Sequence, residues 1–245
     1  MNFDLRFGQP TSYDFDTILD QFSGTKINSF RTSSIPLVQF WKDTNVRLIE
    51  LLNKLSLHSD NTTLCFEYPT KPELGKGKSS MTDLMILSQN FKIAIEAKFT
   101  EYKEMKPDII SNWEKKGNRE NRLKVLEYWT SLIKPFSKGL DYNSIQNIDY
   151  QFYHRTASAC KCIGKAIVVY QIFYDEKTFD YLENYKNQLS DYVRVVNPNE
   201  NLDFYIWEIE VVQRIKDDIE INPFIEMKSQ NIYDFIKSDL TEIKN

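Results

Sequence analysis

The chain has 245 residues, of which 41% are hydrophobic and 14% aromatic, enough for one large domain with a substantial core. No apolar run approaches the roughly 18 residues that a transmembrane helix needs, and the first residues lack the pattern of a signal peptide. Three cysteines, an odd number in a long chain, argue against a disulfide framework. We therefore expect a cytoplasmic protein that does not bind a membrane.

The formal net charge of −4 does not by itself indicate a nucleic-acid partner, but the charges are unevenly distributed. Residues 180–245 hold 14 acidic and 7 basic residues, which leaves a basic excess in residues 1–179. A polyanion would therefore bind the first three quarters of the chain. The alternative is that the acidic C-terminal part only keeps the protein soluble.

The N-terminal part contains two predicted units. Residues 1–35 are polar and interrupted by glycine and proline, which predicts an irregular N-terminal arm with a little helix. Threonine and serine residues then precede Pro36 and offer an N-cap. Apolar residues recur at helical spacing after this proline, which predicts a helix over 36–56.

Three strand patterns follow, over residues 63–68, 82–89 and 91–100. Gln89-Asn90 has the length of a two-residue hairpin loop. With that loop, Asp83 lies directly opposite Glu96, and Lys98 points to the same face of the sheet. Opposed carboxylates destabilise a sheet unless positive charge lies between them, as a bound Mg²⁺ or Mn²⁺ would provide. A register shifted by one residue would place the two acids on opposite faces.

Two basic segments flank this hairpin. The loop 69–80 contains a glycine-rich stretch that fails the phosphate-loop pattern, because a proline stands at the first glycine position and a strand follows. Residues 115–124 hold five basic residues and one acidic residue, leading into a predicted helix over 123–133. Each segment suits contact with a nucleic-acid backbone, although a solvated surface has the same composition. The side chains that we single out are Lys76, Lys78, Arg119 and Arg122.

A further helix is predicted over 149–163, with Gly164 as the residue that ends it. Gln151 and Arg155 are four residues apart and share one face, and the planar guanidinium of Arg155 suits a phosphate. The alternative is a surface arginine. The two cysteines of this helix face apart and its histidine lacks an orienting acid, so neither a zinc site nor a hydrolase pair is predicted.

The remaining patterns predict a buried strand over 165–174, a helix over 179–195, a strand over 204–212 and a final amphipathic helix over 232–243. Because strands and helices alternate, the order of elements predicts an α/β fold. In this fold a mixed central β-sheet is flanked by helices on both faces.

The most informative stretch is Asp83 followed a dozen residues later by Glu96-Ala97-Lys98. It resembles the motif of the PD-(D/E)XK nuclease superfamily, in which an acid on one strand precedes Glu-x-Lys on the next. Glu67, on the preceding strand pattern, and Glu50, in the preceding helix pattern, match positions where many members carry a further acid. The alternative is that both are ordinary solvent-facing glutamates. The sequence departs from the motif at Thr82, where the motif has proline.

The resemblance covers roughly residues 36–175 and implies a restriction-endonuclease-like core within a single nuclease-like domain, residues 1–245. Residues 101–148 would then be an insertion in this core. Residues 176–245 would be a C-terminal extension.

The resemblance also implies an Mg²⁺-dependent DNA endonuclease of restriction or defence type. Asp83 and Glu96 would bind one or two Mg²⁺ ions, with the carbonyl of Ala97 as a further ligand. Lys98 would position the attacking water, and Glu67 would complete a second metal shell. Cutting both strands of a duplex would favour a homodimer. Two alternatives stay open: a repair, junction or RNA nuclease of the same superfamily, and a non-catalytic nucleic-acid-binding module on this fold.

Overall fold

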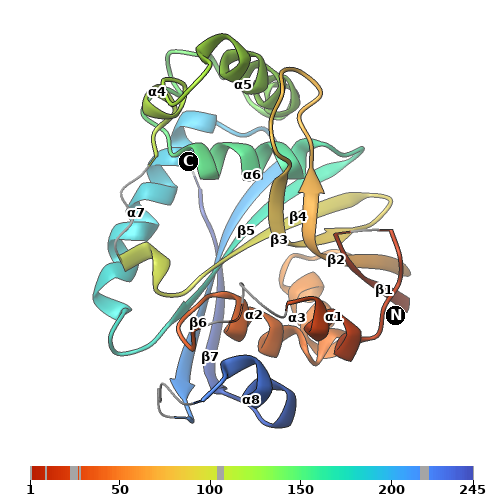
Figure 1. The fold of residues 1–245 in the computed structure, drawn as a ribbon. Coiled ribbons are helices and arrows are strands. Elements are labelled where there is room, and N and C mark those ends of the chain that lie inside the picture. Colours follow the sequence, from red (N-terminus) through yellow and green to blue (C-terminus); the bar gives the residue numbers. More distant parts are fainter. Residues whose placement is uncertain are drawn as a thin grey trace.

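The computed structural model describes residues 2–8, 10–22, 27, 29–103, 108–215 and 221–244. Within these residues, seven strands form one mixed sheet whose spatial order follows the chain (Figure 1). The pairs β1–β2, β4–β5 and β5–β6 are parallel, and the other three pairs are antiparallel. The strands are β1 (Asn2–Phe7), β2 (Asn61–Thr70), β3 (Ser80–Leu87), β4 (Phe91–Lys98), β5 (Lys165–Tyr174), β6 (Leu202–Gln213) and β7 (Tyr233–Glu242).

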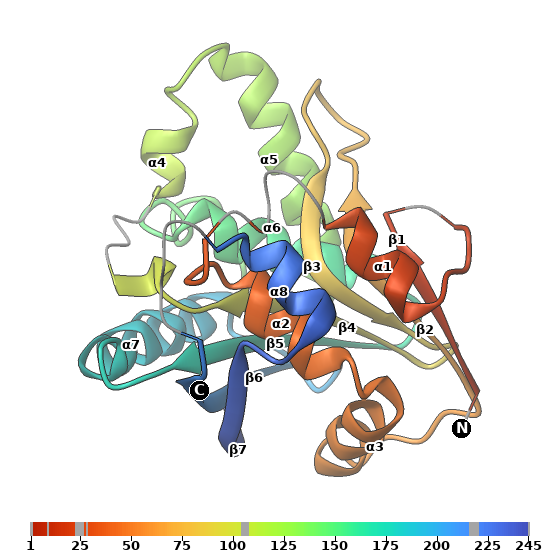
Figure 2. The same cartoon turned by 60° about the horizontal axis from the view of Figure 1, so that its bottom comes forward.

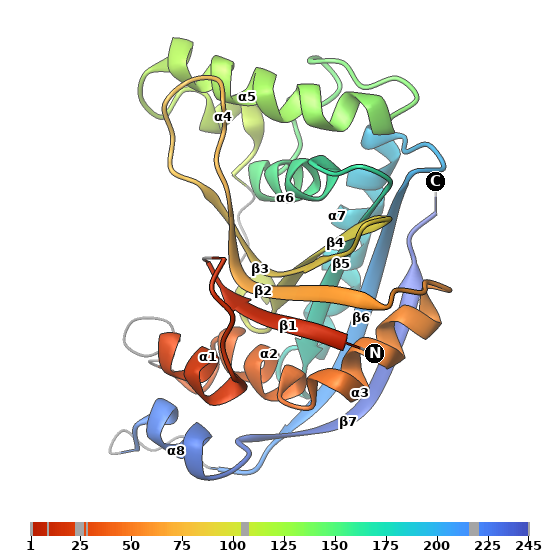
Figure 3. The ribbon, with the colours of Figure 1, turned by 90° about the vertical axis from the view of Figure 1, so that its right-hand side faces the viewer.

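Helices cover both faces of this sheet, which confirms the predicted α/β arrangement (Figures 2 and 3). One face carries α1 (Phe15–Gln21), α2 (Ser34–Trp41), α3 (Thr44–Lys54) and α8 (Pro223–Ser229). The other face carries α4 (Ile110–Trp113), α5 (Arg119–Ile133), α6 (Tyr150–Cys160) and α7 (Phe179–Val196). Each group of helices closes a separate hydrophobic cluster against its own face of the sheet. Among the described residues, no helix combines the length and the apolar character needed to cross a membrane.

Strand β4 is buried along its whole length, because both of its faces are covered. Ile93 and Ile95 pack into the cluster on the α2 side, whereas Ala94 packs into the cluster on the α6 side. Since side chains alternate along a strand, Glu96 and Lys98 lie on the α6 side with Ala94. The charges of these two side chains are therefore removed from water and need partners within the protein.

Most of the predicted elements are present. The strands predicted within residues 63–212 correspond to β2, β3, β4, β5 and β6, with ends shifted by a few residues. The helices predicted over 123–133, 149–163 and 179–195 correspond to α5, α6 and α7. The predicted helix over 36–56 is wrong as a single element, because the chain forms α2 and α3 instead. The Thr44 hydroxyl donates to the Trp41 carbonyl, 2.6 Å between oxygens, and so satisfies a carbonyl at the break.

Both edges of the sheet differ from the prediction. The final helix predicted over 232–243 is wrong, because this segment forms β7 and pairs antiparallel with β6. Residues 2–7 of the predicted irregular arm form β1, which pairs parallel with β2. In both places a neighbouring strand offers unpaired backbone groups, and pairing with them outweighs a weak local preference.

Gly164 does not end a helix as predicted, since α6 ends at Cys160. Gly164 has φ +100°, and a Cβ there would stand 2.9 Å from the Asn90 carbonyl carbon in the β3–β4 loop. Gly164→Ala is therefore expected to lower the free energy of unfolding by roughly 2–4 kcal/mol, because backbone strain and overpacking add. Urea denaturation measures this loss. Gly139→Ala is the control, since a Cβ at Gly139 would meet nothing within 4 Å; equal losses in both variants would contradict the expectation.

Candidate active site

The β3–β4 hairpin has the register expected for a two-residue loop. Four residue pairs run from Leu84 opposite Ile95 to Leu87 opposite Lys92. The Ser88 amide donates to the Phe91 carbonyl, 3.0 Å between nitrogen and oxygen, and closes the loop. Continuing this register by one pair places Asp83 opposite Glu96. The predicted register is thus confirmed for these four pairs. The same register brings the Asp83 and Glu96 side chains to the α6 side of the sheet, where the Glu96 charge acts on Asp83.

Glu67 lies level with this pair on the next strand. The β2–β3 pairs on either side of it are Phe66 with Leu84 and Tyr68 with Thr82. Glu67 is 5% exposed and has φ +50°, a left-handed conformation that is uncommon for a residue other than glycine. Backbone strain of this kind is maintained only where the surrounding structure enforces it, and it clusters at functional sites. Three acidic residues thus lie in one row across β2, β3 and β4.

Glu96 is bound by two cations and one amide. Its Oε1 accepts hydrogen bonds from Lys98 Nζ at 3.0 Å and from Gln151 Nε2 at 2.7 Å. Its Oε2 accepts a hydrogen bond from Arg155 Nε. Lys98 and Arg155 are each 7% exposed, so these are buried ion pairs. Such charge-assisted bonds in a low-dielectric environment are strong, but only because each charge is compensated.

Helix α6 supplies two of these partners. The Asp149 carboxylate caps α6 by accepting from the Gln151 amide, with Oδ1 and nitrogen 2.8 Å apart. Gln151 and Arg155 are one turn apart on the helix and both reach Glu96, so the predicted common face exists. This face is directed at the sheet and not at solvent. Asp83 has a different partner, since its Oδ2 accepts from the Ala97 amide at 2.8 Å.

The two opposed carboxyl groups have pKa values shifted in opposite directions. Burial, with the nearby Glu96 charge, raises the pKa of Asp83 to about 7. Burial also disfavours the charged form of Glu96, but Arg155 and Lys98 outweigh this effect and lower the pKa of Glu96 to about 2. The pKa of Lys98 is raised, because the attraction of Glu96 and Asp83 exceeds the effect of burial. Glu96 therefore stays ionised, while Asp83 exchanges its proton near neutral pH.

This raised pKa predicts a pH-dependent stability in metal-free buffer. Between pH 3.8 and 7 the folded protein keeps a proton on Asp83 that the unfolded chain has lost. The stabilisation is complete below the unfolded pKa and is lost as pH rises through about 7. The side chain of Asp83→Asn is neutral at every pH. The free energy of unfolding of this variant, relative to that of wild type, should therefore rise by on the order of 2 kcal/mol from pH 5 to pH 8. Urea denaturation with EDTA measures this gain, and exposed Asp43→Asn should show none. A difference in the free energy of unfolding between Asp83→Asn and wild type that stays constant from pH 5 to pH 8 would contradict the expectation.

A basic cleft of about 630 Å³ adjoins the ion pairs. It lies between the β2–β3 loop, the α4–α5 loop, α5 and α6. Four of the six predicted nucleic-acid-binding residues line it: Lys76, Lys78, Arg122 and Arg155. Gln151 does not line the cleft, and exposed Arg119 instead pairs with Glu114, 3.2 Å from nitrogen to oxygen.

The cleft also contains side chains that the sequence did not single out. Ser80 Oγ lies 2.7 Å from His154 Nδ1, and Arg155 Nη1 donates to the same oxygen at 2.7 Å. Trp113 and Tyr150 stack there with ring centroids 3.8 Å apart. Ser80 and His154 are 74 residues apart in the chain, so no local spacing could have paired them.

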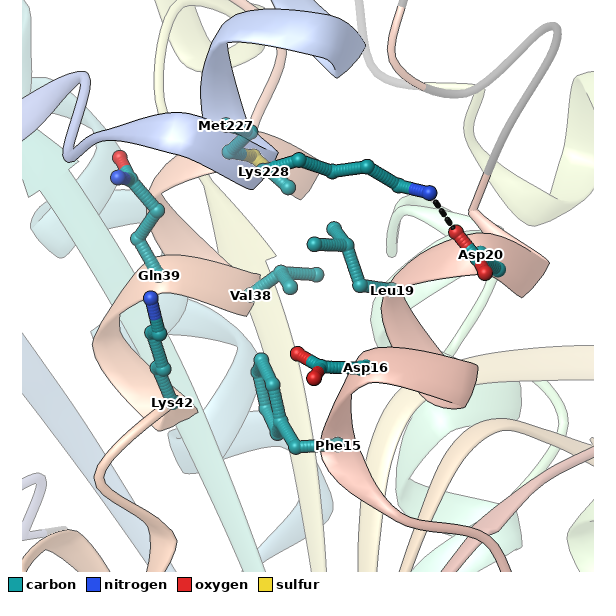
Figure 4. A pocket seen from close by; sticks show the side chains of 9 residues that line it. All are labelled: Phe15, Asp16, Leu19, Asp20, Val38, Gln39, Lys42, Met227 and Lys228. Carbon is teal, nitrogen blue, oxygen red and sulfur yellow. Dashed lines mark ion pairs between the residues drawn. The ribbon is translucent and has the colours of Figure 1, made fainter.

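Within the described ranges, no three His, Cys, Asp or Glu side chains converge as metal ligands. A second pocket, of about 280 Å³, lies on the opposite face of the sheet between α1, α2 and α8 (Figure 4). Lys228 and Asp20 form an ion pair at this pocket. None of the residues predicted for catalysis or nucleic-acid binding lines it.

Comparison with curated proteins gave no match, and comparison with solved structures gave none. A family model matches residues 14–210, from the N-cap of α1 into β6. This range includes the carboxylate pair, its partners on α6 and the whole basic cleft. The match covers most of the chain, which therefore belongs to the family described as a domain of unknown function (DUF6946).

Proposed function

We propose that the protein is a metal-dependent endonuclease that hydrolyses DNA phosphodiester bonds. The observation that carries the proposal is the pair Asp83 and Glu96, opposed across β3–β4 beside Lys98 and next to the basic cleft. The order β2, β3, β4, α6, β5, with α4 and α5 inserted between β4 and α6 and with β4 and β5 parallel, also supports it. This succession agrees with the restriction-endonuclease-like core that the motif implies.

The donor set suits a hard divalent cation. Burial and, after it, the Glu96 charge raise the pKa of Asp83, and a cation between the two carboxyl groups would offset both effects. Mg²⁺ is commonly held by one or two carboxylates, with water and phosphate completing its shell, so two acids suffice. Asp83 and Glu96 would hold Mg²⁺ or Mn²⁺, with the Ala97 carbonyl as a further ligand. The ion would polarise the phosphate and lower the pKa of a bound water.

The protein side chains have separate roles in this proposal. Lys98 orients the attacking water and stabilises the negative charge that develops on the phosphate. Arg155 helps to keep Glu96 ionised, and the hydrogen bonds from Arg155 and Gln151 fix the orientation of its carboxylate. Glu67, level with Asp83 on β2, supports the outer shell of the site. The basic cleft binds the nucleic-acid backbone through its lysines.

One observation favours a second candidate, a non-catalytic nucleic-acid-binding module. Both Glu96 oxygens already accept hydrogen bonds from cationic side chains, so the cluster is compensated without a metal. In this case the ion pairs serve only to join α6 to β4. Metal binding separates the two candidates, since the structural cluster needs none.

The test is cleavage of plasmid DNA, both supercoiled and denatured to single strands, with Mg²⁺ or with EDTA. Wild type is expected to nick or linearise the plasmid only with Mg²⁺, and Asp83→Asn to be slower by roughly a hundredfold or more. Asp43→Asn is the matched control, because Asp43 is exposed and away from the hairpin. Equal cleavage by wild type and Asp83→Asn would refute the assignment. Absence of Mn²⁺ binding by calorimetry, even with DNA present, would favour the non-catalytic module.

A further inference from the structure

We infer that the basic cleft receives an unpaired nucleotide of a nucleic-acid strand, an inference that rests on the proposed function and names its substrate form. The first argument is charge. Every side chain of the cleft that carries a charge at neutral pH is cationic, and no Asp or Glu lines it. Lys76, Lys78 and Arg122 form no ion pair within the described part of the chain, so their charges are available to phosphates.

The second argument is size. A volume of about 630 Å³ falls within the range of clefts that hold a single small ligand. The β2–β3 loop is fixed against α5 on one side of the cleft. The Asn121 side chain accepts from the Lys76 amide and donates to the Lys76 carbonyl, both at 2.6 Å. A double helix, whose major groove alone is roughly 12 Å wide, does not fit into such a space, whereas one nucleotide does.

The third argument is the planar wall of the cleft. The Arg122 guanidinium lies over the Trp113 ring, 4.6 Å from Cζ to the centroid, and Arg122 Nη1 donates to the Trp113 carbonyl at 2.8 Å. Trp113 in turn stacks on Tyr150 with an interplanar angle of 13°. Unpaired bases stack on aromatic rings and on arginine planes, and such stacking tolerates any base.

The fourth argument is a hydrogen-bond donor at the same place. Arg155 donates to Ser80 Oγ, so the Ser80 hydroxyl hydrogen is available to His154 Nδ1. The proton of the neutral imidazole is then on Nε2. Burial, with the nearby Arg155 charge, lowers the pKa of His154 well below its ordinary value and keeps the ring neutral. Within the described residues no hydrogen bond involves Nε2, so it can donate to a base carbonyl or a phosphate.

Arg155 connects this cleft to the carboxylate pair. It lines the cleft, donates to Ser80 and also binds Glu96. Asp83 and Glu96 do not themselves line the cleft, so Arg155 is the side chain through which a nucleotide held there adjoins Glu96. An unpaired segment, such as a single strand or a flap, is the substrate form that meets this geometry.

The test is fluorescence anisotropy in EDTA with a labelled 12-nucleotide single strand and the same sequence in a blunt hairpin duplex. The single strand, whether DNA or RNA, is expected to bind at least tenfold more tightly than the duplex. Equal or tighter binding of the duplex would overturn the inference. A free mononucleotide should compete with the strand, whereas competition by inorganic phosphate alone to the same extent would show an anion site only and would also overturn it.

Two variants separate stacking from charge. Arg122→Lys keeps the charge but loses the planar group, and we expect it to weaken single-strand binding about tenfold. The double variant Lys76→Ala/Lys78→Ala should bind the single strand more weakly and with a smaller salt dependence. The control is the double variant Lys138→Ala/Lys177→Ala, which removes two exposed lysines outside the cleft and should leave binding unchanged. Unchanged single-strand binding by Arg122→Lys would show that bases do not stack on the planar wall of the cleft.

The inference and the proposed function can fail separately. Tight single-strand binding without Mg²⁺-dependent cleavage of any strand would leave the inference standing and refute the nuclease. Mg²⁺-dependent cleavage of intact duplex with no preference for unpaired strands would support the nuclease and refute the inference.

Discussion

Glu96→Ala is expected to lower the free energy of unfolding by about 3–5 kcal/mol, because it leaves buried Lys98 and Arg155 without their shared anion. A buried charge that loses its partner keeps its desolvation cost and loses the attraction that offset it. Gln151 would also lose the acceptor of its side-chain amide. For a chain of this length, the loss corresponds to a fall in Tm of roughly 6–20 °C.

Urea denaturation of Glu96→Ala and Glu50→Ala provides the comparison. Glu50 also has two cationic partners, Arg47 at 2.9 Å and Lys54 at 3.3 Å, but its side chain is 23% exposed. A partly exposed pair of this kind contributes only about 0–1 kcal/mol. If both variants lost a similar free energy of unfolding, burial would not be what makes the ion pairs of Glu96 important for stability.

Lys98→Met is expected to reduce Mg²⁺-dependent cleavage by at least about a hundredfold, the size of effect seen when one group that stabilises transition-state charge is removed. The protein should remain folded, because Glu96 keeps Arg155 and Gln151 as partners. Methionine has a similar length and fills the space of the lysine stem. The effect on cleavage is thus separable from an effect on stability.

Lys92→Met is the matched control for this variant. Lys92 is on the same strand and the same face as Lys98, is 4% exposed, and donates to the Lys161 carbonyl at 3.3 Å. It lies six residues from Lys98, at the other end of β4. Single-turnover cleavage should be unchanged in Lys92→Met and lost in Lys98→Met, with circular dichroism to verify folding. Equal cleavage rates in both variants would show that Lys98 has no catalytic role.

The hairpin was predictable because its information is local. A two-residue loop fixes the register, and alternation along each strand then fixes the face of Asp83, Glu96 and Lys98. The shared face of Gln151 and Arg155 was predictable for the same reason, since it depends only on helical spacing. These features need no knowledge of what packs against them.

The direction of that helix face was decided by packing. The sequence suggested that Arg155 contacts a phosphate or lies on the surface, but α6 packs on β4 and directs Arg155 to Glu96. The contacts between Asn121 and Lys76 join residues 45 apart in the chain. No period or motif relates such positions, so the closure of the basic cleft could not be foreseen.

The sequence by itself indicated the strand and helix periods of the central part, the register that opposes two carboxyl groups, and a motif that resembles that of a nuclease superfamily. Only the tertiary structure decided that residues 2–7 and 233–242 are edge strands, because an edge segment adopts the pairing that its neighbour offers. Only the tertiary structure, too, gave Asp83 and Glu96 opposite pKa shifts. The physical reason is that burial and the charges of distant residues, which set these shifts, arise when the chain is packed and are not encoded by any local spacing.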